Sequence, residues 1–99
     1  MTRATGYRSM LDLDLSDAEY FGGVTASTAE SPSDRDPRSV TLSLIGNSGE
    51  AQIVAWSDGQ AQFLVYDAAA SDFAVDRYIE HFDTSSLHDL LNEARRLIT

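Results

Sequence analysis

Hydrophobic and polar residues alternate along three consecutive segments in the second half of the chain. The segments are Val40–Leu44, Ala51–Trp56 and Ala61–Tyr66, and turns that contain Gly separate them. Alternation with a period of two is typical of β-strands with two different faces, and short Gly-containing turns favour antiparallel hairpins. With a fourth strand expected over Phe73–Ile79, the pattern predicts an antiparallel meander.

Near the C-terminus the apolar spacing changes to that of a helix. We expect a helix over residues 86–98, with Ser85 or Ser86 as its N-cap, because apolar residues there recur every three or four positions. The predicted fold class is therefore α+β, with a four- to five-stranded antiparallel meander sheet and a C-terminal helix packed on one face. The apolar face of the helix consists of Leu87, Leu90, Leu91, Ala94, Leu97 and Ile98.

The first forty residues carry weaker signals. Leu11–Leu15 alternates strictly between Leu and Asp, which predicts an additional strand of the sheet. Ser16–Glu19 has the spacing of a capping box and predicts a short helical turn that Gly22-Gly23 ends. Residues 25–38, rich in Ser, Thr, Pro and Asp, predict a flexible loop within a single domain of residues 1–99.

The lengths of the turns predict which side chains share a face of the sheet. A four-residue turn at 46–49 places Leu42 opposite Ile53, and a two-residue turn at Asp58-Gly59 places Ile53 opposite Leu64. Opposed residues of an antiparallel pair point to the same side. One face then forms an aliphatic core for the helix, made of Val40, Leu42, Leu44, Ala51, Ile53, Leu64, Phe73 and Val75.

The opposite face is expected to be more apolar than a sheet covered on one side requires. Aromatic and aliphatic residues gather on it inside a rim of carboxylates that includes Glu50 and Asp72. Either residues 11–24 fold across this face and bury it, or the face is a dimer interface or a partner site. The predicted interaction site consists of Val54, Trp56, Phe63, Val65, Tyr78, Asp76 and Glu80.

Charge narrows the classes of partner. The chain has 16 acidic and 7 basic residues, which gives a formal net charge of −9. Such a surface repels phosphate backbones and anionic lipids, so we expect no nucleic acid and no membrane partner, whereas a basic protein is compatible. No segment has the apolar length of a membrane span or of a secretory signal, so the expected location is cytoplasmic.

The residue types that most catalytic sites need are sparse. Lys and Cys are absent, which excludes Schiff-base lysines, thiol nucleophiles and thiolate metal sites. The histidines, His81 and His88, have no recognisable ligand spacing, and the chain has no nucleophile elbow and no phosphate-binding Gly loop. We therefore expect no enzyme activity, no metal and no cofactor, but a domain that binds protein.

The meander formed by Leu42–Gly46, Ala51–Gly59 and Phe63–Tyr66, followed by a helix over Leu87–Leu97, resembles the small immunity proteins of bacterial polymorphic toxin systems. The likeness is to the type associated with deaminase toxins, and it covers residues 40–99. It implies a cytoplasmic inhibitor, without catalysis of its own, that binds and occludes a cognate and often basic toxin. A homodimeric structural or regulatory adaptor that uses the same sheet face explains the same residues.

Overall fold

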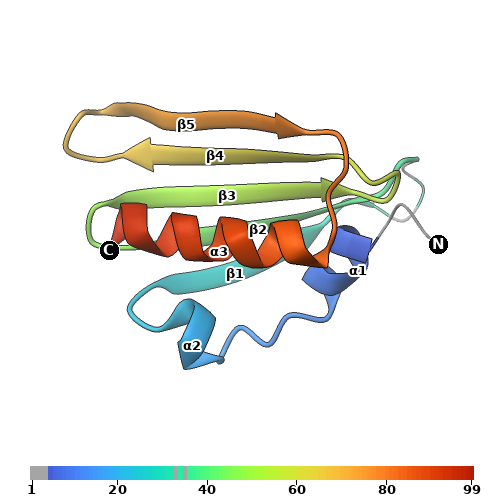
Figure 1. Ribbon diagram of the computed structural model, residues 1–99, viewed down its shortest axis with the longest axis horizontal. Coiled ribbons are helices and arrows are strands. Elements are labelled where there is room, and N and C mark those ends of the chain that lie inside the picture. The colour runs from blue at the N-terminus through green and yellow to red at the C-terminus, as the bar shows by residue number, and fades with distance from the viewer. Residues whose placement is uncertain (1–4, 33, 35) are drawn as a thin grey trace.

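The computed structural model describes residues 5–32, 34 and 36–99, and within them one five-stranded antiparallel sheet with strands in chain order (Figure 1). The predicted α+β class, a meander sheet with a C-terminal helix against it, is confirmed. The elements are Thr5–Leu11 (α1), Ala18–Phe21 (α2), Thr25–Glu30 (β1), Ser39–Ile45 (β2), Gly49–Trp56 (β3), Ala61–Asp67 (β4), Asp72–Ile79 (β5) and Thr84–Ile98 (α3).

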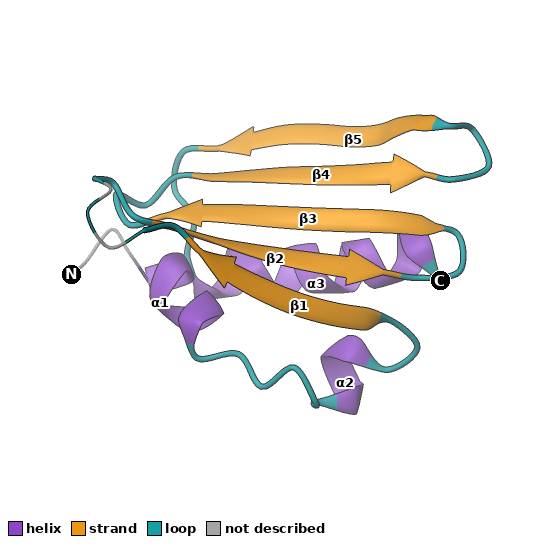
Figure 2. Ribbon diagram, turned by 180° about the vertical axis from the view of Figure 1, so that it is seen from behind, coloured by secondary structure: helices purple, strands orange, loops and turns teal. Residues whose placement is uncertain are grey.

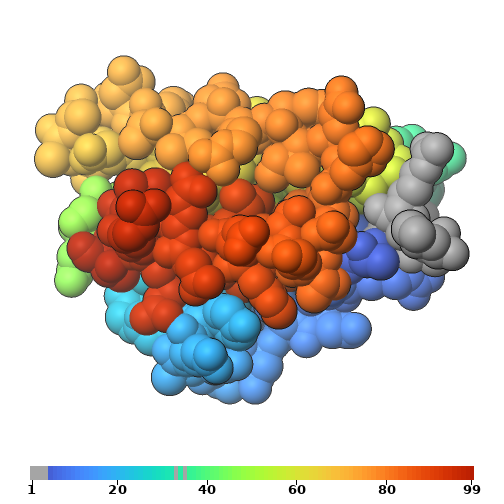
Figure 3. Space-filling model, in the orientation of Figure 1, coloured from blue at the N-terminus to red at the C-terminus, as the bar shows by residue number. Residues whose placement is uncertain are grey.

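The hydrophobic core lies between the sheet and the helices, which share one side of it. α3 and α1 pack against each other and against the central strands, and α2 packs against α3. In the space-filling view, α3 and the N-terminal segments hide most of the central strands from this side (Figure 3). Fully buried side chains include Leu42 and Ile53 from the sheet and Leu87 and Leu91 from α3.

The junction between β5 and α3 differs slightly from the sequence prediction. α3 begins at Thr84 because Asp83, rather than Ser85 or Ser86, is the N-cap, and its carboxylate accepts a hydrogen bond from the backbone N–H of Ser86 at 2.8 Å. The hydrogen bonds from Ser86 lower the pKa of the Asp83 carboxyl. An N-cap carboxylate satisfies helix N–H groups that would otherwise have no partner.

The N-terminal predictions were partly wrong. Leu11 ends α1, and the residues after it form no strand, although Leu13 and Leu15 are half-buried against the core while Asp12 and Asp14 are exposed. The alternation therefore reflects burial of every second side chain without a strand partner. The short helix after it does form, as α2, with Asp17 as its N-cap.

The additional strand is β1, which pairs with β2 at the edge of the sheet. Residues 25–38 are therefore not a loop throughout, because residues 25–30 belong to β1; positions 33 and 35 lie outside the described residues. β1 has the sequence TASTAE and only Ala26 is half-buried. An edge strand with so little burial carries almost no hydrophobic pattern, which is why its composition predicted a loop.

The register between β3 and β4 differs by one residue from the predicted one. Gly59, with φ of 100°, closes a turn in which Trp56 donates a hydrogen bond to the carbonyl of Gln60 at 2.8 Å. The loop therefore has three residues instead of two, and Ile53 lies opposite Phe63. A one-residue slip sends every side chain of a strand to the other face.

Candidate interaction face

Figure 2 shows the sheet from the side that faces away from α3, and no helix of the described residues crosses the central strands there. We call this side the open face. The strand register assigns it Thr25, Ser27, Ala29, Ser39, Thr41, Ser43, Ile45, Glu50, Gln52, Val54, Trp56, Gln62, Leu64, Tyr66, Phe73, Asp76 and Tyr78.

Residues 11–24 do not cover the open face, so that alternative is wrong. α2 lies against α3 on the helix side, where the Tyr20 ring stacks on His88 with ring centroids 5.3 Å apart. The Arg95 guanidinium donates hydrogen bonds to the backbone carbonyls of Glu19 and Gly22 at the end of α2. These contacts hold the N-terminal segment on the side of the sheet that the helices occupy.

Two of the predicted interaction residues lie in the core. Phe63 is 0% exposed and Val65 is 1% exposed, because the three-residue turn directs both toward α3. The Arg77 guanidinium lies 5.6 Å from the centre of the Phe63 ring and forms an ion pair of 3.0 Å with Glu93 of α3. These two side chains stabilise the fold and cannot contact a partner in the folded state.

The other predicted residues are accessible from the open face or its border. Val54 and Trp56 are half-buried on β3, and Tyr78 is 55% exposed on β5. Asp76 accepts a hydrogen bond from the amide of Gln62 at 3.1 Å. The Tyr78 hydroxyl donates to the side-chain carbonyl of Gln60. The last residue, Glu80, is exposed just beyond the end of β5.

The sequence analysis missed three of the four exposed large hydrophobic residues of the open face. Ile45 is 51% exposed, Tyr66 36% and Phe73 59%. With Tyr78 they are four of the six exposed large hydrophobic residues in the described part of the chain, and the other two lie on helices. Tyr66 lies opposite Phe73, and both point away from the core, so the expected place of Phe73 in the aliphatic core is wrong.

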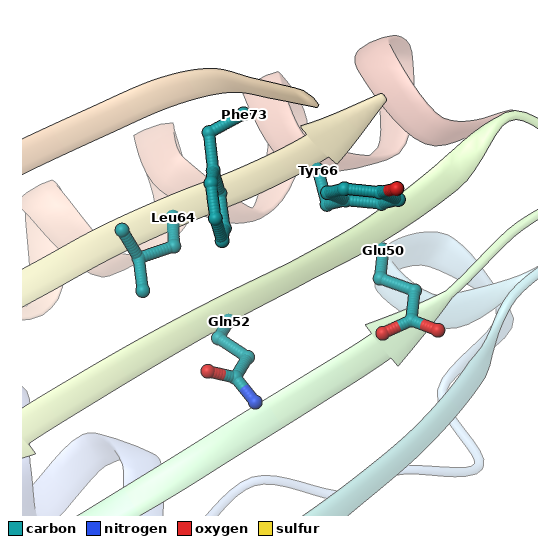
Figure 4. A pocket seen from close by; sticks show the side chains of 5 residues that line it. All are labelled: Glu50, Gln52, Leu64, Tyr66 and Phe73. Carbon is teal, nitrogen blue, oxygen red and sulfur yellow. The ribbon is translucent and has the colours of Figure 1, made fainter. Parts of the chain in front are cut away.

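A depression of about 350 Å³ lies at one end of the open face. Its lining comes from β3, β4 and β5, and Figure 4 shows the Phe73 ring between the side chains of Leu64 and Tyr66. The rings of Tyr66 and Phe73 meet edge to face, with centroids 5.7 Å apart. Glu50 and Gln52 form the β3 side of the depression.

The charges that the register places on the open face are all negative. They are Glu50 and Asp76, and no basic residue shares these strand positions. Among the described residues, no three His, Cys, Asp or Glu side chains are close enough together to hold a metal ion. No helix in that part of the chain has both the length and the apolar character needed to cross a bilayer.

The fold and this face together define a small α+β domain with one uncovered, partly apolar sheet surface. No family model, curated protein or solved structure matches the chain. The function is therefore inferred from the geometry of the open face.

Proposed function

We propose that this chain is a non-catalytic protein-binding domain whose open face binds a basic protein. The observation that carries the proposal is the concentration of exposed large hydrophobic residues on the open face, the side of the sheet that α1, α2 and α3 leave uncovered. An antiparallel sheet covered on one side normally has a polar outer face. Contiguous apolar surface beyond a few hundred Å² is typical of interaction sites.

The residue types of the open face suit the centre of an interface. Aromatic residues contribute most of the binding energy at many interfaces because they bury a large area and lose little conformational entropy. Tyr66, Phe73 and Tyr78 are exposed aromatic residues on neighbouring strands. Polar residues such as Gln52 and Ser43 lie on the same face on the neighbouring strands β3 and β2, and an interface likewise combines an apolar centre with a polar rim.

Charge supports a basic partner over a second copy of the chain. The net charge is −9, and two of the carboxylates that contribute to it, Glu50 and Asp76, lie on the open face, where no strand position carries a base. Two copies that met through this face would bring like charges together, which costs free energy and slows association. The same negative charges attract a basic partner, and this attraction accelerates association at low salt.

The most specific form of the proposal is an immunity-type inhibitor, which the resemblance of residues 40–99 implies. In this form the open face covers the active site of a cognate toxin encoded by a neighbouring gene. The alternative is a homodimeric adaptor that associates through the same face. Sedimentation of the isolated chain separates the two, because only the adaptor forms dimers as its concentration rises.

The test is a double variant, Tyr66→Ser with Phe73→Ser, and its control is Leu97→Ser. Leu97 is also an exposed hydrophobic residue, at 38%, but it lies on α3. Circular dichroism should show that both variants fold, because the replaced side chains are exposed. The double variant should bind the toxin at least about thirtyfold more weakly, because the loss of even one aromatic anchor costs about 2 kcal/mol or more. It should also fail to restore the growth of cells that express the toxin.

The control variant should bind and rescue as the wild type does. If the wild type and the double variant bind the toxin with equal affinity, the proposal is contradicted. A dimer of the wild type that the double variant abolishes, without any toxin binding, would favour the adaptor.

A further inference from the structure

The depression on the open face combines two aromatic rings with a carboxylate that forms no ion pair within the described residues. We propose that it receives an arginine side chain of the protein partner. This inference rests on the proposed protein-binding function and adds the chemical group that the open face recognises. The residues that carry it are Glu50, Tyr66 and Phe73, with Gln52 and Leu64 completing the depression.

Glu50 determines which charge the occupant must have. The ion pair found among the described residues joins Arg77 to Glu93 on the other side of the sheet, so Glu50 has no cationic partner within that part of the chain. A protein that covers the depression removes water from the Glu50 carboxylate. Removal of a carboxylate from water is costly unless the occupant supplies hydrogen-bond donors or an opposite charge. An apolar occupant would leave that cost uncompensated, whereas a basic side chain offsets it.

The aromatic rings favour arginine over lysine. Tyr66 and Phe73 meet edge to face, so a cation in the depression lies beside ring surfaces as well as beside the carboxylate. A guanidinium is planar, stacks on aromatic rings and can donate two parallel hydrogen bonds to one carboxylate. A lysine ammonium is more strongly hydrated and cannot stack.

The depression is large enough to admit a long side chain. Its volume of about 350 Å³ is near the lower end of the roughly 300–1,000 Å³ that small-molecule sites occupy. Leu64 provides an apolar contact for the methylene groups of the arginine, and the side-chain carbonyl of Gln52 provides a further acceptor. The depression is therefore complementary to a long side chain with an apolar stem and a planar cationic head.

The test uses the whole chain and N-acetyl-arginine amide as the probe, in an NMR titration of backbone amides at constant ionic strength. The matched probes are the lysine analogue and the neutral citrulline analogue, whose urea group has the shape of a guanidinium without its charge. We expect the arginine probe to shift the amide signals of β3, β4 and β5 around Glu50, with a dissociation constant on the order of 10 mM. The lysine probe should bind more weakly, and the citrulline probe should cause no saturable shift.

A variant of Glu50 then tests whether its carboxylate binds the arginine probe. Glu50→Gln should weaken arginine binding about two- to fivefold, the usual range for an exposed ion pair. Glu30→Gln is the control. Glu30 lies on β1, at the far edge of the sheet from β5, and is opposite the buried Val40 of β2. Its replacement should leave the titration unchanged. Equal shifts with arginine and citrulline, or an unchanged titration in Glu50→Gln, would overturn the arginine site.

The arginine site and the proposed function can fail separately. If the arginine probe gives no shifts while the Tyr66→Ser/Phe73→Ser variant no longer binds the toxin, the arginine site is wrong, but the open face is still the binding surface. If arginine binds but the double variant keeps full affinity for the toxin, the open face is not the binding surface. The depression then has no role in partner recognition.

Discussion

Replacement of Phe63 by Ala tests which face of β4 packs in the hydrophobic core. Phe63 is 0% exposed beneath α3, whereas the next residue, Leu64, is half-buried on the open face. Truncation of a buried Phe costs about 3–5 kcal/mol through lost transfer energy and the cavity left behind. A domain of this size has a free energy of unfolding of roughly 5–15 kcal/mol, so Phe63→Ala removes a large part of it. Leu64→Ala should cost about 1 kcal/mol or less.

The assay is urea unfolding followed by circular dichroism, with the free energy of unfolding extrapolated to water. Val65→Ala is a milder companion in case Phe63→Ala does not fold, since Val65 is 1% exposed. The loss of its two methyl groups should cost about 2 kcal/mol. If Leu64→Ala destabilises the protein more than Val65→Ala does, the three-residue turn is wrong and β4 has the register of the two-residue turn.

Two further predictions concern the ends of α2 and α3. The N-cap hydrogen bonds lower the folded-state pKa of Asp83, so its stabilising effect is present above the unfolded pKa of about 4 and is lost as the pH falls through the lower folded pKa. The midpoint temperature of thermal unfolding should therefore differ between the wild type and Asp83→Asn by a constant amount near pH 6, and this difference should vanish in strong acid. A difference that does not change with pH would contradict the prediction. Arg95→Met keeps the apolar stem but removes the donors to the carbonyls of Glu19 and Gly22, which should cost about 1–3 kcal/mol. Hydrogen exchange at the amide of Phe21 should accelerate, and unchanged protection would mean that Arg95 does not hold α2.

The sequence was sufficient to predict the pairing of β2 with β3. The Gly46–Gly49 turn predicted Leu42 opposite Ile53, and the structure confirms this register. In the turn, the N–H of Gly46 donates to the carbonyl of Gly49 at 2.9 Å. The prediction succeeded because the turn length and the alternating pattern of both strands agree on one register.

The β3–β4 register could have been predicted from burial instead of from the turn. Both the two-residue and the three-residue turn place Gly59 where its φ is positive, so the dipeptide Asp58-Gly59 cannot distinguish them. The alternation of β4 can, because one parity has Gln62 within the strand, whereas the other has Ala61, Phe63 and Val65 and reaches a charged residue only at the end of the strand, Asp67. Burial of an amide without a partner is costly, so the parity of Phe63 belongs in the core. The pattern should have taken precedence over the turn type.

The edge strand and the N-terminal helix were beyond this kind of reasoning. β1 gains its hydrogen bonds from β2, whose register is set by residues far along the chain, and its own side chains are mostly exposed. α1 is only Thr5–Leu11 and its sequence lacks acidic residues in the first turn. Short helices depend on tertiary packing, here the burial of Tyr7 and Met10, so local signals do not predict them.

The apolar character of the open face follows from β4 whichever register holds. One parity of β4 carries Phe63 and Val65, and the other carries Leu64 and Tyr66. A one-residue slip therefore exchanges which pair faces α3 and still leaves two large side chains on the open face. Strands that are apolar on both sides are typical of sheets covered by two layers. Within the described residues this chain supplies one such layer, α3 with α1, and the second parity of β4 favours a partner protein as the other.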